Sequence, residues 1–338
     1  MSNYVLVTGG AGYIGSHSVV ALIEAGYNPI VLDNFSNSSK ESISGIEKIC
    51  GAGPVVIEGD VGNSSLLMNI FSSYNVNSVL HFSGLKSVEE STAEPLKYYS
   101  ENVGSSLSLL RAMQEAKVQK LIFSSSATVY NPESQLPYTE KSPTKPINPY
   151  GQTKLCIEQI LHGLADVNPK WRIGILRYFN PVGAHPSGHI GEDPKQQPNN
   201  LMPLIMQTAV GRREKLLIYG DDYDTPDGTC IRDYIHVSDL ARGHLSALRY
   251  LDKHEGLHIW NLGTGKGTSV QELIKKAREV TGAEIKTEIR SKRSGDSPEA
   301  VADPKKAKDE LLWQPEYSIG NMCADHWNWQ RQNPDGYQ

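Results

Sequence analysis

A glycine-rich turn near the N-terminus constrains the fold of this chain more than any other feature. Gly9, Gly12 and Gly15 recur at every third position, and Gly10, Gly12 and Gly15 also fit the pattern GxGxxG. The turn follows a short apolar segment, residues 4–8, and opens an amphipathic segment, residues 14–25. Such glycines permit a tight turn, a close approach of the backbone to a pyrophosphate and close packing of a helix on a strand. A glycine turn without a ligand is the alternative, but the strand–turn–helix context favours a dinucleotide site.

Two acidic residues at the ends of the following strands refine this site. Asp33 ends the second predicted strand, and no arginine follows it directly. A carboxylate at this place accepts hydrogen bonds from a ribose 2′-hydroxyl and repels a 2′-phosphate, so we expect NAD and not NADP as the cofactor. Asp60 follows the third predicted strand. It is either an adenine contact or the N-cap of the next helix.

Short apolar segments alternate with helix-period segments through the first half of the chain. Strands are predicted at residues 4–8, 29–33, 55–58, 78–82, 121–124 and 173–177, and helices at 14–25, 65–74, 95–116 and 150–166. This alternation predicts an α/β fold, with a Rossmann-type doubly wound parallel sheet in residues 1–178. The Ser-rich residues 36–44 are expected to form a loop.

The pattern changes after about Tyr178, where proline and glycine become frequent and predicted strands become sparse. Helices are predicted at residues 201–210, 238–251, 269–281, 304–312 and 319–332. We expect residues 179–338 to form a smaller C-terminal α/β substrate-binding domain, with some chain crossing between the two domains.

Composition excludes several classes of partner. The net charge of -5 argues against a general affinity for nucleic acid or acidic membrane surfaces. The four cysteines are scattered without a CxxC pair, so we expect no metal site and a reducing, cytoplasmic location. No apolar run approaches the roughly 20 residues that a membrane span needs, and no signal peptide is recognisable.

Tyr150 and Lys154 form a YxxxK pair, and positions four apart share one face of a helix. A phenol has a pKa near ~10, so a tyrosine base needs its pKa lowered by roughly three units, or about 4 kcal/mol. An ammonium one turn away and a positive nicotinamide ring favour the phenolate. YxxxK also occurs by chance on surface helices. Here it follows a predicted Rossmann half and three serines, Ser124 to Ser126, at a strand end, which favours a catalytic pair.

The chain also resembles the extended short-chain dehydrogenase/reductase family, and within it the enzymes that epimerise UDP-hexoses at C4. The resemblance rests on residues 8–17 (TGGAGYIGSH), 82–86 (FSGLK), 124–130 (SSSATVY), 176–181 (LRYFNP), 198–203 (PNNLMP) and 232–237 (RDYIHV). It implies that Tyr150 takes the proton of the sugar 4-hydroxyl, assisted by Ser126, while C4 gives hydride to NAD⁺. Hydride then returns to the other face of the 4-keto sugar, so tightly bound NAD serves many turnovers.

The resemblance also implies a set of binding residues. Those for the cofactor are Gly9, Gly12, Tyr13, Ile14, Gly15, Asp33, Asn34, Asp60, Val61, Phe82, Ser83, Gly84, Lys86, Asn102, Ser124, Tyr150, Lys154, Tyr178 and Phe179. Those for the substrate are Lys86, Ser126, Tyr150, Asn180, Asn199, Asn200, Leu201, Tyr219, Arg232, Tyr234, Arg293, Asp296 and Ala300. By this resemblance, Arg232 and Arg293 bind the diphosphate, Asp296 a ribose hydroxyl, and Tyr219 stacks on uracil. A homodimer is also implied, with the helix 95–116 at its interface.

Several positions depart from the commonest pattern of the family. Ser83 and Ser87 replace small apolar residues, Glu89 replaces a glycine without an evident reason, and Asn131 stands at a usual glycine, where a left-handed backbone is tolerated. Ala300 stands where some members carry a tyrosine against the sugar. An aromatic side chain covers roughly 150–250 Å². Ala300 therefore predicts room for UDP-GlcNAc and UDP-GalNAc as well as UDP-glucose and UDP-galactose, unless neighbouring side chains fill the gap.

Two rival functions fit the sequence less well. A nucleotide-sugar 4,6-dehydratase needs an acid and a base after the serine, where this chain has Ala127 and Thr128. A non-catalytic NAD-binding scaffold would typically lose the Tyr/Lys pair, which this chain keeps as Tyr150 and Lys154.

Overall fold

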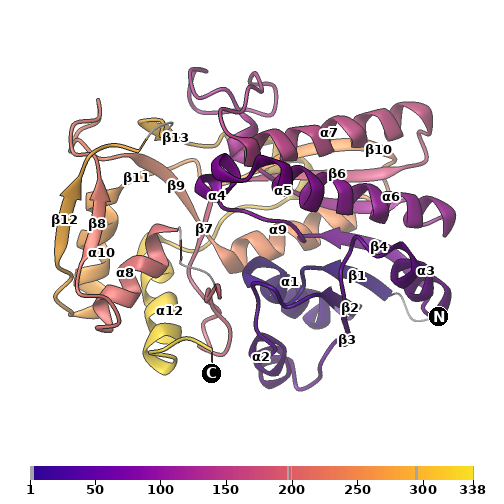
Figure 1. The fold of residues 1–338 in the computed structure, drawn as a ribbon, viewed down its shortest axis with the longest axis horizontal. Coiled ribbons are helices and arrows are strands. Elements are labelled where there is room, and N and C mark those ends of the chain that lie inside the picture. The colour runs from indigo at the N-terminus through magenta and orange to yellow at the C-terminus, as the bar shows by residue number, and fades with distance from the viewer. Residues whose placement is uncertain (1–3, 196–197, 199, 294–295, 338) are drawn as a thin grey trace.

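The centre of the molecule is a parallel β-sheet that occupies the larger lobe of the computed structural model (Figure 1). The structure describes residues 4–195, 198, 200–293 and 296–337. The sheet has seven strands in the order β10-β6-β5-β4-β1-β2-β3. Their bounds are β1 (Tyr4–Thr8), β2 (Asn28–Asp33), β3 (Val55–Glu58), β4 (Val76–His81), β5 (Lys120–Ser126), β6 (Arg172–Tyr178) and β10 (Gly256–Leu262). The predicted doubly wound parallel sheet is therefore confirmed.

The direction in which strands are added to the sheet reverses between β1 and β4. These two strands pair directly, although the chain forms β2 and β3 between them. Sheets of this type bind ligands in the crevice outside the carboxyl ends of the strands at such a reversal. Gly9 directly follows the end of β1, and Phe82 directly follows the end of β4. The glycine turn and residues 82–86 therefore border this crevice.

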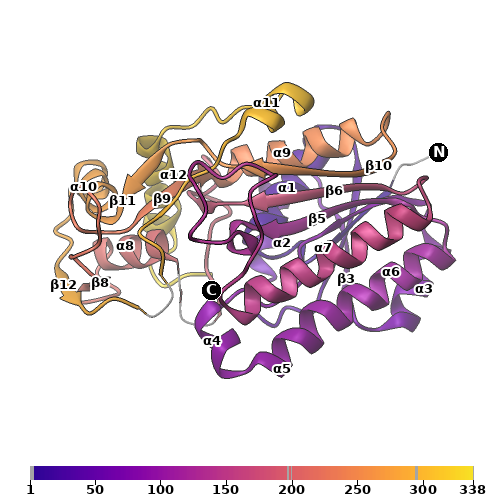
Figure 2. The ribbon, with the colours of Figure 1, turned by 90° about the horizontal axis from the view of Figure 1, so that it is seen from above.

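Helices cover both faces of the sheet (Figure 2). On one face pack α1 (Tyr13–Glu24), α2 (Glu41–Cys50), α9 (Val237–Tyr250) and α11 (Lys305–Leu311). On the other pack α3 (Ser64–Ser73), α6 (Ser105–Glu115) and α7 (Pro149–Val167). Successive side chains of a strand point to opposite faces, so the apolar strands of the first half supply both layers of core.

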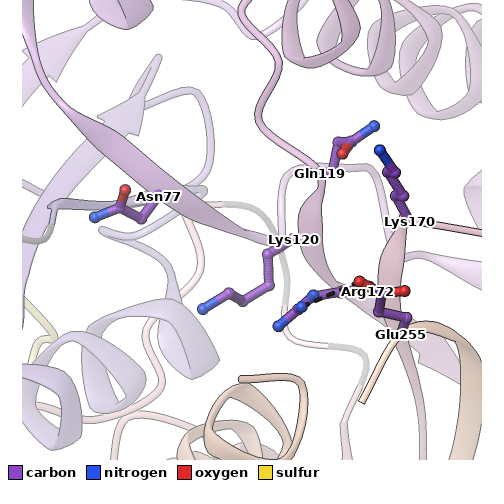
Figure 3. Close-up of a pocket in the computed structure, with 6 residues that line it drawn as sticks. All are labelled: Asn77, Gln119, Lys120, Lys170, Arg172 and Glu255. Atoms are coloured by element: carbon purple, nitrogen blue, oxygen red, sulfur yellow. Dashed lines mark hydrogen bonds and ion pairs between the residues drawn. The ribbon is translucent and has the colours of Figure 1, made fainter. Parts of the chain in front are cut away.

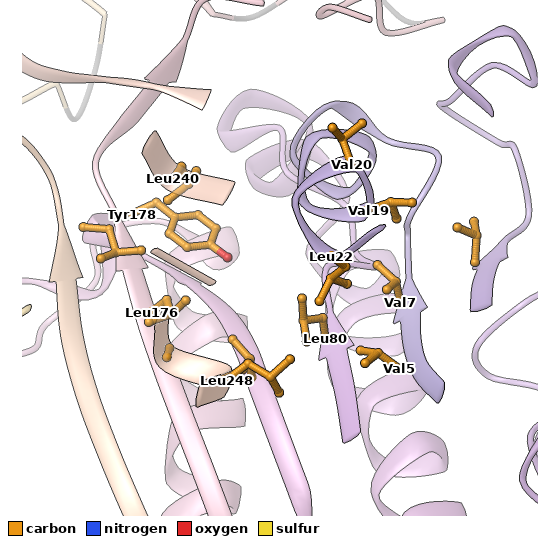
Figure 4. Packing of buried hydrophobic residues seen from close by; sticks show 14 of the residues in the cluster. Val5, Val7, Val19, Val20, Leu22, Leu80, Leu176, Tyr178, Leu240 and Leu248 are labelled. Carbon is orange, nitrogen blue, oxygen red and sulfur yellow. The ribbon is translucent and has the colours of Figure 1, made fainter. Parts of the chain in front are cut away.

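Apolar side chains of the sheet pack in the core beneath α1 and α9 (Figure 4). Val5 and Val7 of β1 and Leu80 of β4 pack against Leu22 of α1 and Leu248 of α9, and all five are at most 1% exposed. Burying such a side chain contributes about 1.5–3 kcal/mol. These contacts fix α1 on the sheet, and its first turn therefore lies at the edge of the crevice.

The second half contains more strands than the sequence predicts. Its smaller lobe has a sheet of β7 (Asn180–Val182), β9 (Ile231–His236), β11 (Gly267–Ser269) and β13 (Glu299–Ala300), and a pair of β8 (Leu216–Tyr219) and β12 (Thr287–Arg290). Helices α8 (Leu201–Ala209), α10 (Val270–Thr281) and α12 (Ile319–Gln332) pack on them (Figure 1). The expectation of sparse strands was wrong because all of these strands except β9 have only two to four residues, too few to show a period of two. Strand β10 meanwhile returns to the first sheet beside β6.

The predicted loop at residues 36–44 and the predicted helix at 95–116 also need correction. Helix α2 begins at Glu41, inside the segment 36–44 that the sequence predicts to be a loop. The helix predicted at 95–116 is three pieces: α5 (Pro95–Tyr98), a π-helical turn (Tyr99–Gly104) and α6. None of the helices in the described part of the chain has the length and apolar character that crossing a membrane requires.

Two departures from the family pattern are explained by helix α4 (Val88–Ala93). The Ser87 side chain caps this helix by accepting a hydrogen bond from Glu90 N at 3.2 Å. Glu89 lies exposed in the first turn, where the helix dipole favours a negative charge. Asn131, in contrast, is not among the described non-glycine residues with positive φ. The left-handed backbone that an asparagine would tolerate at this position is therefore not adopted.

Candidate active site

The glycine turn is shaped by contacts that a side chain would block. Gly9 has φ +71°, and a Cβ on it would lie 2.8 Å from Ser83 N, which brings the turn against the segment after β4. A Cβ on Gly15 would lie 2.2 Å from Gly9 O, so helix α1 packs directly on the turn. A Cβ on Gly12 would meet only Gly9 O, at 3.3 Å. The backbone at Gly12 is therefore open on its outer side.

The N-terminus of α1 fits a pyrophosphate. Its N-cap is Gly12, which has no side chain to cap the helix, and its first turn has no acidic residue. The first N–H groups of a helix lack partners within the helix and attract anions, more so with the helix dipole. The helix itself continues from this end through Tyr13 and Ile14, and the Tyr13 hydroxyl donates to Gly183 O at 2.7 Å.

The Asp33 carboxylate holds the glycine turn and can still accept one further hydrogen bond. Its Oδ2 accepts from Ala11 N at 3.0 Å, and its Oδ1 accepts from Phe35 N at 2.9 Å and from Ser38 Oγ at 2.8 Å. A carboxylate has about four lone-pair sites, so one site on Oδ2 remains for a further donor such as a ribose hydroxyl.

Asn34 and Asp60 form the outer edge of the crevice. Asn34 Nδ2 donates to Asp60 Oδ2 at 2.8 Å, and Asp60 Oδ1 accepts from Gly62 N at 2.7 Å. The N-cap of α3 is Asn63, so the alternative of Asp60 as a helix N-cap is wrong. Val61, next in the chain, is 7% exposed and belongs to the core under α3.

Asn102 connects the segment after β4 to helix α7. It lies in the π-helical turn and is 2% exposed. Its Oδ1 accepts from Leu85 N at 2.7 Å, and its Nδ2 donates to Leu85 O and to Thr153 Oγ1, each at 3.1 Å. Gly84, with φ +150°, lies against the Asn102 side chain. Most of the hydrogen-bonding capacity of Asn102 is therefore used in positioning this segment.

Lys86 forms a contact that the sequence did not predict. Its Nζ lies 3.0 Å from Glu192 Oε1, which also accepts from Asn200 Nδ2 at 2.7 Å. The Glu192 side chain is 2% exposed, whereas half of the Lys86 side chain is accessible. Glu192 thus connects a predicted cofactor residue with a predicted substrate residue. No local pattern marks it, because Lys86 and Glu192 are 106 positions apart.

Ser126, Tyr150 and Lys154 come together at the carboxyl edge of the sheet. Ser126 is the last residue of β5, and Tyr150 and Lys154 lie on the first turns of α7, which Asn148 caps by accepting from Gly151 N at 2.8 Å. Lys154 Nζ donates to Ser124 O at 2.7 Å and lies 5.9 Å from the centre of the Tyr150 ring. The predicted constellation is thus assembled.

Burial controls the protonation of this pair. Burial raises the pKa of Tyr150 to about 12, and a hydrogen bond from Ser126 partly opposes that rise. Burial lowers the pKa of Lys154 to about 8, while the charge of Glu158 raises it. The direction for Tyr150 is opposite to the one that a base needs, so phenolate formation depends on positive charge brought close to the ring.

The remaining predicted cofactor residues line the carboxyl ends of neighbouring strands. Phe82 follows β4, Ser124 lies in β5, Tyr178 ends β6, and Phe179 follows it. The Tyr178 hydroxyl is hydrogen-bonded to His244 Nε2, and the His244 ring lies 4.8 Å from that of Phe82.

Four predicted substrate residues are neighbours in the sheet of the smaller lobe. Asn180 of β7 pairs with Tyr234 of β9, and Ala300 of β13 pairs with Arg232 of β9. Arg232 Nη1 donates to Ile231 O at 2.8 Å and to Pro298 O at 3.5 Å, so its Nε and Nη2 groups are left without a partner among the described hydrogen bonds. Asn200 is the N-cap of α8 and Leu201 its first residue, while Asn199 lies outside the described residues.

Tyr219 and Arg293, predicted to hold different parts of the substrate, stack on each other. The Arg293 guanidinium carbon lies 3.9 Å from the centre of the Tyr219 ring. One face of Tyr219 is therefore covered by a cation, which is a favourable arrangement for an aromatic ring. Asp296 is exposed nearby in sequence, and its backbone N donates to Arg293 O at 3.5 Å.

A separate hollow of about 420 Å³ lies at the opposite, amino-terminal edge of the sheet (Figure 3). Its lining residues are Asn77, Gln119, Lys120, Lys170, Arg172 and Glu255. Arg172 donates to Asp252 O at 2.7 Å and pairs with Glu255 at 3.2 Å, and Lys120 pairs with Asp252. These cations are largely neutralised, and the hollow lies away from the catalytic edge. In the described part of the chain, no three His, Cys, Asp or Glu side chains are grouped as a metal ion would require.

Comparisons with known proteins agree with this geometry. The sequence model of the NAD dependent epimerase/dehydratase family matches residues 5–263. A UDP-glucose 4-epimerase of Dictyostelium discoideum is 52% identical over 334 residues, which is 98% of this chain and 97% of that protein. The crystal structure of UDP-glucose 4-epimerase from Bifidobacterium longum in complex with NAD⁺ and UDP superimposes with a TM-score of 0.97 at 47% identity, covering 99% of this chain and 100% of that one.

A more distant structure is relevant to substrate choice. The UDP-Glc/GlcNAc 4-epimerase of Campylobacter jejuni superimposes with a TM-score of 0.84 at 37% identity, covering 98% of this chain and 100% of that one. The family model matches residues 5–263, and these relatives each cover 98% or more of the chain. The chain therefore belongs to the NAD dependent epimerase/dehydratase family, with NAD as its cofactor.

Proposed function

We propose that this protein interconverts UDP-glucose and UDP-galactose by inverting the configuration at C4 of the sugar. The observation that carries the proposal is the meeting of Ser126, Tyr150 and Lys154 at the carboxyl edge of the sheet, the edge at which the glycine turn follows β1. The relatives named UDP-glucose 4-epimerase support the same assignment over the whole chain.

The residues present fit NAD. Gly12 and the free end of α1 would hold the pyrophosphate, and the open acceptor site on Asp33 would bind the adenosine ribose. Asn34 and Asp60 would border the adenine, and Lys86 the pyrophosphate or ribose. When bound there, NAD would supply a reversible hydride acceptor for C4 of the sugar.

Tyr150 is proposed to accept the proton of the sugar 4-hydroxyl. Burial disfavours its phenolate, as the pKa near 12 indicates. The Lys154 ammonium, 5.9 Å from the ring, favours the charged phenolate, and Ser126 contributes a hydrogen bond. In the second half-reaction, Tyr150 returns the proton to the sugar oxygen.

The smaller lobe is proposed to hold the UDP group. Arg232 and Arg293 supply charge-assisted hydrogen bonds to the diphosphate, and Tyr219 offers its second face to uracil. Asn180, Asn199, Asn200, Leu201, Tyr234 and Asp296 complete the proposed set. The domains are proposed to divide near Tyr178, with β10 and helices α9 and α11 returning to the first sheet.

We further propose that UDP-GlcNAc and UDP-GalNAc are substrates. Ala300 is half-buried and packs against the cluster of Val129, Tyr130, Tyr138 and Phe179. Tyr138 is 3% exposed and stacks on Tyr130 at 5.0 Å, which argues against its swinging across to fill the space beside Ala300. The similarity to an enzyme described as a UDP-Glc/GlcNAc 4-epimerase is in keeping with this wider specificity.

A homodimer in the cytoplasm is the proposed working state. Leu96 of α5 is 84% exposed and Tyr99 of the π-helical turn is 41% exposed, so this region offers apolar side chains to a second copy. Light scattering after size exclusion tests the dimer, and Leu96→Glu should yield the monomer. The four cysteines are free, as is usual in a reducing compartment.

The test of the proposed activity is direct. Purified protein with NAD is incubated with UDP-galactose, and the products are separated and identified. We expect UDP-glucose to form, and Tyr150→Phe to abolish its formation. A 4-keto-6-deoxy product would indicate a dehydratase instead. No turnover of UDP-galactose by folded, NAD-loaded protein would refute the proposed function.

A further inference from the structure

The short turn that follows Ser126 contains Thr128, to which the proposed reaction assigns no role. Ser126 caps a 3-10 turn, Ala127–Val129, and its Oγ accepts two hydrogen bonds from Thr128. One comes from Thr128 N at 3.2 Å and the other from Thr128 Oγ1 at 2.9 Å. A serine hydroxyl has two acceptor lone pairs and one proton to donate. With both acceptor positions engaged by Thr128, the Ser126 hydroxyl can act only as a donor.

The turn is also held firmly against the helix that carries Tyr150. Gly151 directly follows Tyr150, and a Cβ on Gly151 would lie 2.7 Å from Thr128 O and 2.9 Å from Pro146 Cβ. The absence of a side chain at Gly151 thus lets the Thr128 backbone pack on the first turn of α7. Thr128 and Tyr150 therefore lie on two rigid segments in direct contact.

We propose that Thr128 is a positioning residue that fixes the Ser126 hydroxyl as a hydrogen-bond donor to Tyr150. This inference rests on the proposed function, because it concerns the same base. The order of donation is Thr128 Oγ1 to Ser126 Oγ to Tyr150 Oη. The proton of the sugar 4-hydroxyl then passes directly to Tyr150 Oη, and Ser126 keeps its own proton while it stabilises the phenolate.

The electrostatics of Tyr150 agree with this direction. A hydrogen bond from Ser126 lowers the pKa of Tyr150 against the effect of burial, as a donor to the phenolate should. Among the described residues, the other titratable groups near Tyr150 are Lys154 on the same helix, whose Nζ lies 5.9 Å from the centre of its ring, and Tyr178 on β6, whose pKa the Tyr150 charge raises. Neither contacts Thr128 through a described hydrogen bond, so a change at Thr128 reaches Tyr150 through Ser126.

The experiment compares Thr128→Val, which removes the hydroxyl at nearly constant volume, with Thr128→Ser, which retains it. The matched control is Thr208→Val, because Thr208 is also buried and its hydroxyl donates only to its own helix, at Leu204 O. For Thr128→Val we expect kcat to fall about three- to tenfold, the effect of losing one hydrogen bond. The dissociation constant for UDP-galactose should stay unchanged, and the acid limb of the kcat–pH profile should move to higher pH. Thr128→Ser and Thr208→Val should behave as the parent protein does.

A second arm uses the Ser126→Ala background, in which there is no serine hydroxyl to orient. Thr128→Val should then cause no further fall in kcat, and an equal fall in both backgrounds would overturn the inference. A pH profile of Thr128→Val identical to that of the parent would overturn it as well. If Thr128→Val does not fold, Thr128→Ala removes the same hydroxyl and is judged by the same outcomes. Failure of the parent protein to convert UDP-galactose would instead count against the proposed function.

Discussion

Glu158 of α7 and Arg177 of β6 form a buried, bidentate ion pair between the helix that carries Tyr150 and the central sheet. Arg177 Nη2 donates to Glu158 Oε2 at 2.6 Å, and Arg177 Nε donates to Oε1 at 3.0 Å. The Glu158 and Arg177 side chains are 2% and 4% exposed. Glu158 lies one helical turn beyond Lys154 and two beyond Tyr150, on the same face of α7. The ion pair therefore fixes how the face of α7 that carries Tyr150 and Lys154 packs on the sheet.

Removing one partner of this pair should destabilise the fold strongly. Arg177→Met leaves the Glu158 carboxylate buried, and among the described residues Ser125 Oγ, at 2.5 Å, is then its one remaining donor. We expect the free energy of unfolding to fall by about 3–5 kcal/mol, measured by urea denaturation. The double variant Glu158→Leu/Arg177→Met removes both charges and should recover most of that loss. Lys276→Ala, which breaks an exposed pair with Glu279, is the control and should leave stability nearly unchanged. A small loss in Arg177→Met would show that the pair contributes little.

Four buried histidines should make the fold sensitive to acid. Burial lowers the pKa of His17 and His81 to about 3, and that of His244 and His326 to about 4. An unfolded histidine titrates near ~6.5. Below that pH the unfolded chain binds protons that the folded chain does not, so stability is complete above about 6.5 and is lost as pH falls toward 4. Each histidine contributes a slope of about 1.4 kcal/mol per pH unit in this window.

His326 offers a way to isolate one of these protons. Both of its ring nitrogens lack a hydrogen-bond partner among the described residues, and its ring meets the edge of Trp329 at 6.1 Å. His326→Phe keeps an aromatic ring there and removes the titration. The free energy of unfolding is measured by urea denaturation between pH 6.5 and 4.5. Its slope against pH should decrease by about 1.4 kcal/mol per pH unit, which corresponds to one proton fewer taken up on unfolding. An unchanged slope would mean that His326 is not neutral in the folded state.

The parts of the site that the sequence predicted depend on local spacing. Strand, glycine turn and helix follow each other within residues 4–24, and Tyr150 and Lys154 share a helix face through their separation of four. Ser126 was placed correctly because the end of an apolar strand marks the carboxyl edge of a parallel sheet. Each of these inferences needs only a few neighbouring residues, so no knowledge of long-range contacts was required.

The parts that the sequence missed depend on contacts between distant segments. Glu192 meets Lys86 across 106 positions, and the sheet of the smaller lobe joins strands of two to six residues from separate segments. Thr128 was noted only as a residue unable to act as an acid or base, since its hydrogen bonds to Ser126 appear only in the folded turn. The stacking of Arg293 on Tyr219 was likewise missed because the two residues lie on different strands or loops.

Gly12 and Gly15 should respond differently to alanine. A Cβ on Gly15 would lie 2.2 Å from Gly9 O, so Gly15→Ala must displace the turn and should cost about 1–3 kcal/mol of stability. Gly12 has φ -72°, and its nearest contact would be 3.3 Å, so Gly12→Ala should fold with little loss. Its methyl group would instead occupy the open side proposed for the pyrophosphate. NAD retained after gel filtration, measured per mole of protein, should fall in Gly12→Ala although its thermal stability without added NAD is close to that of the parent. Full NAD content in Gly12→Ala would place the pyrophosphate elsewhere.

Ala300→Tyr should narrow the proposed substrate range. Ala300 lies in register with Arg232 on the neighbouring strand, so a tyrosine there would extend beside the proposed diphosphate site into the space expected for an acetamido group. We expect turnover of UDP-GlcNAc to fall at least tenfold while turnover of UDP-galactose changes less than about threefold, because only the larger sugar loses its space. Competition between UDP-galactose and UDP-GalNAc in one reaction gives the ratio of the two kcat/KM values directly. Ala300→Ser, which adds one oxygen, serves as the control and should keep both activities. Equal loss of both activities in Ala300→Tyr would mean that residue 300 faces a part of the sugar that the two substrates share. The wider specificity would then have to be set by another residue of the cluster, Tyr130, Tyr138 or Phe179.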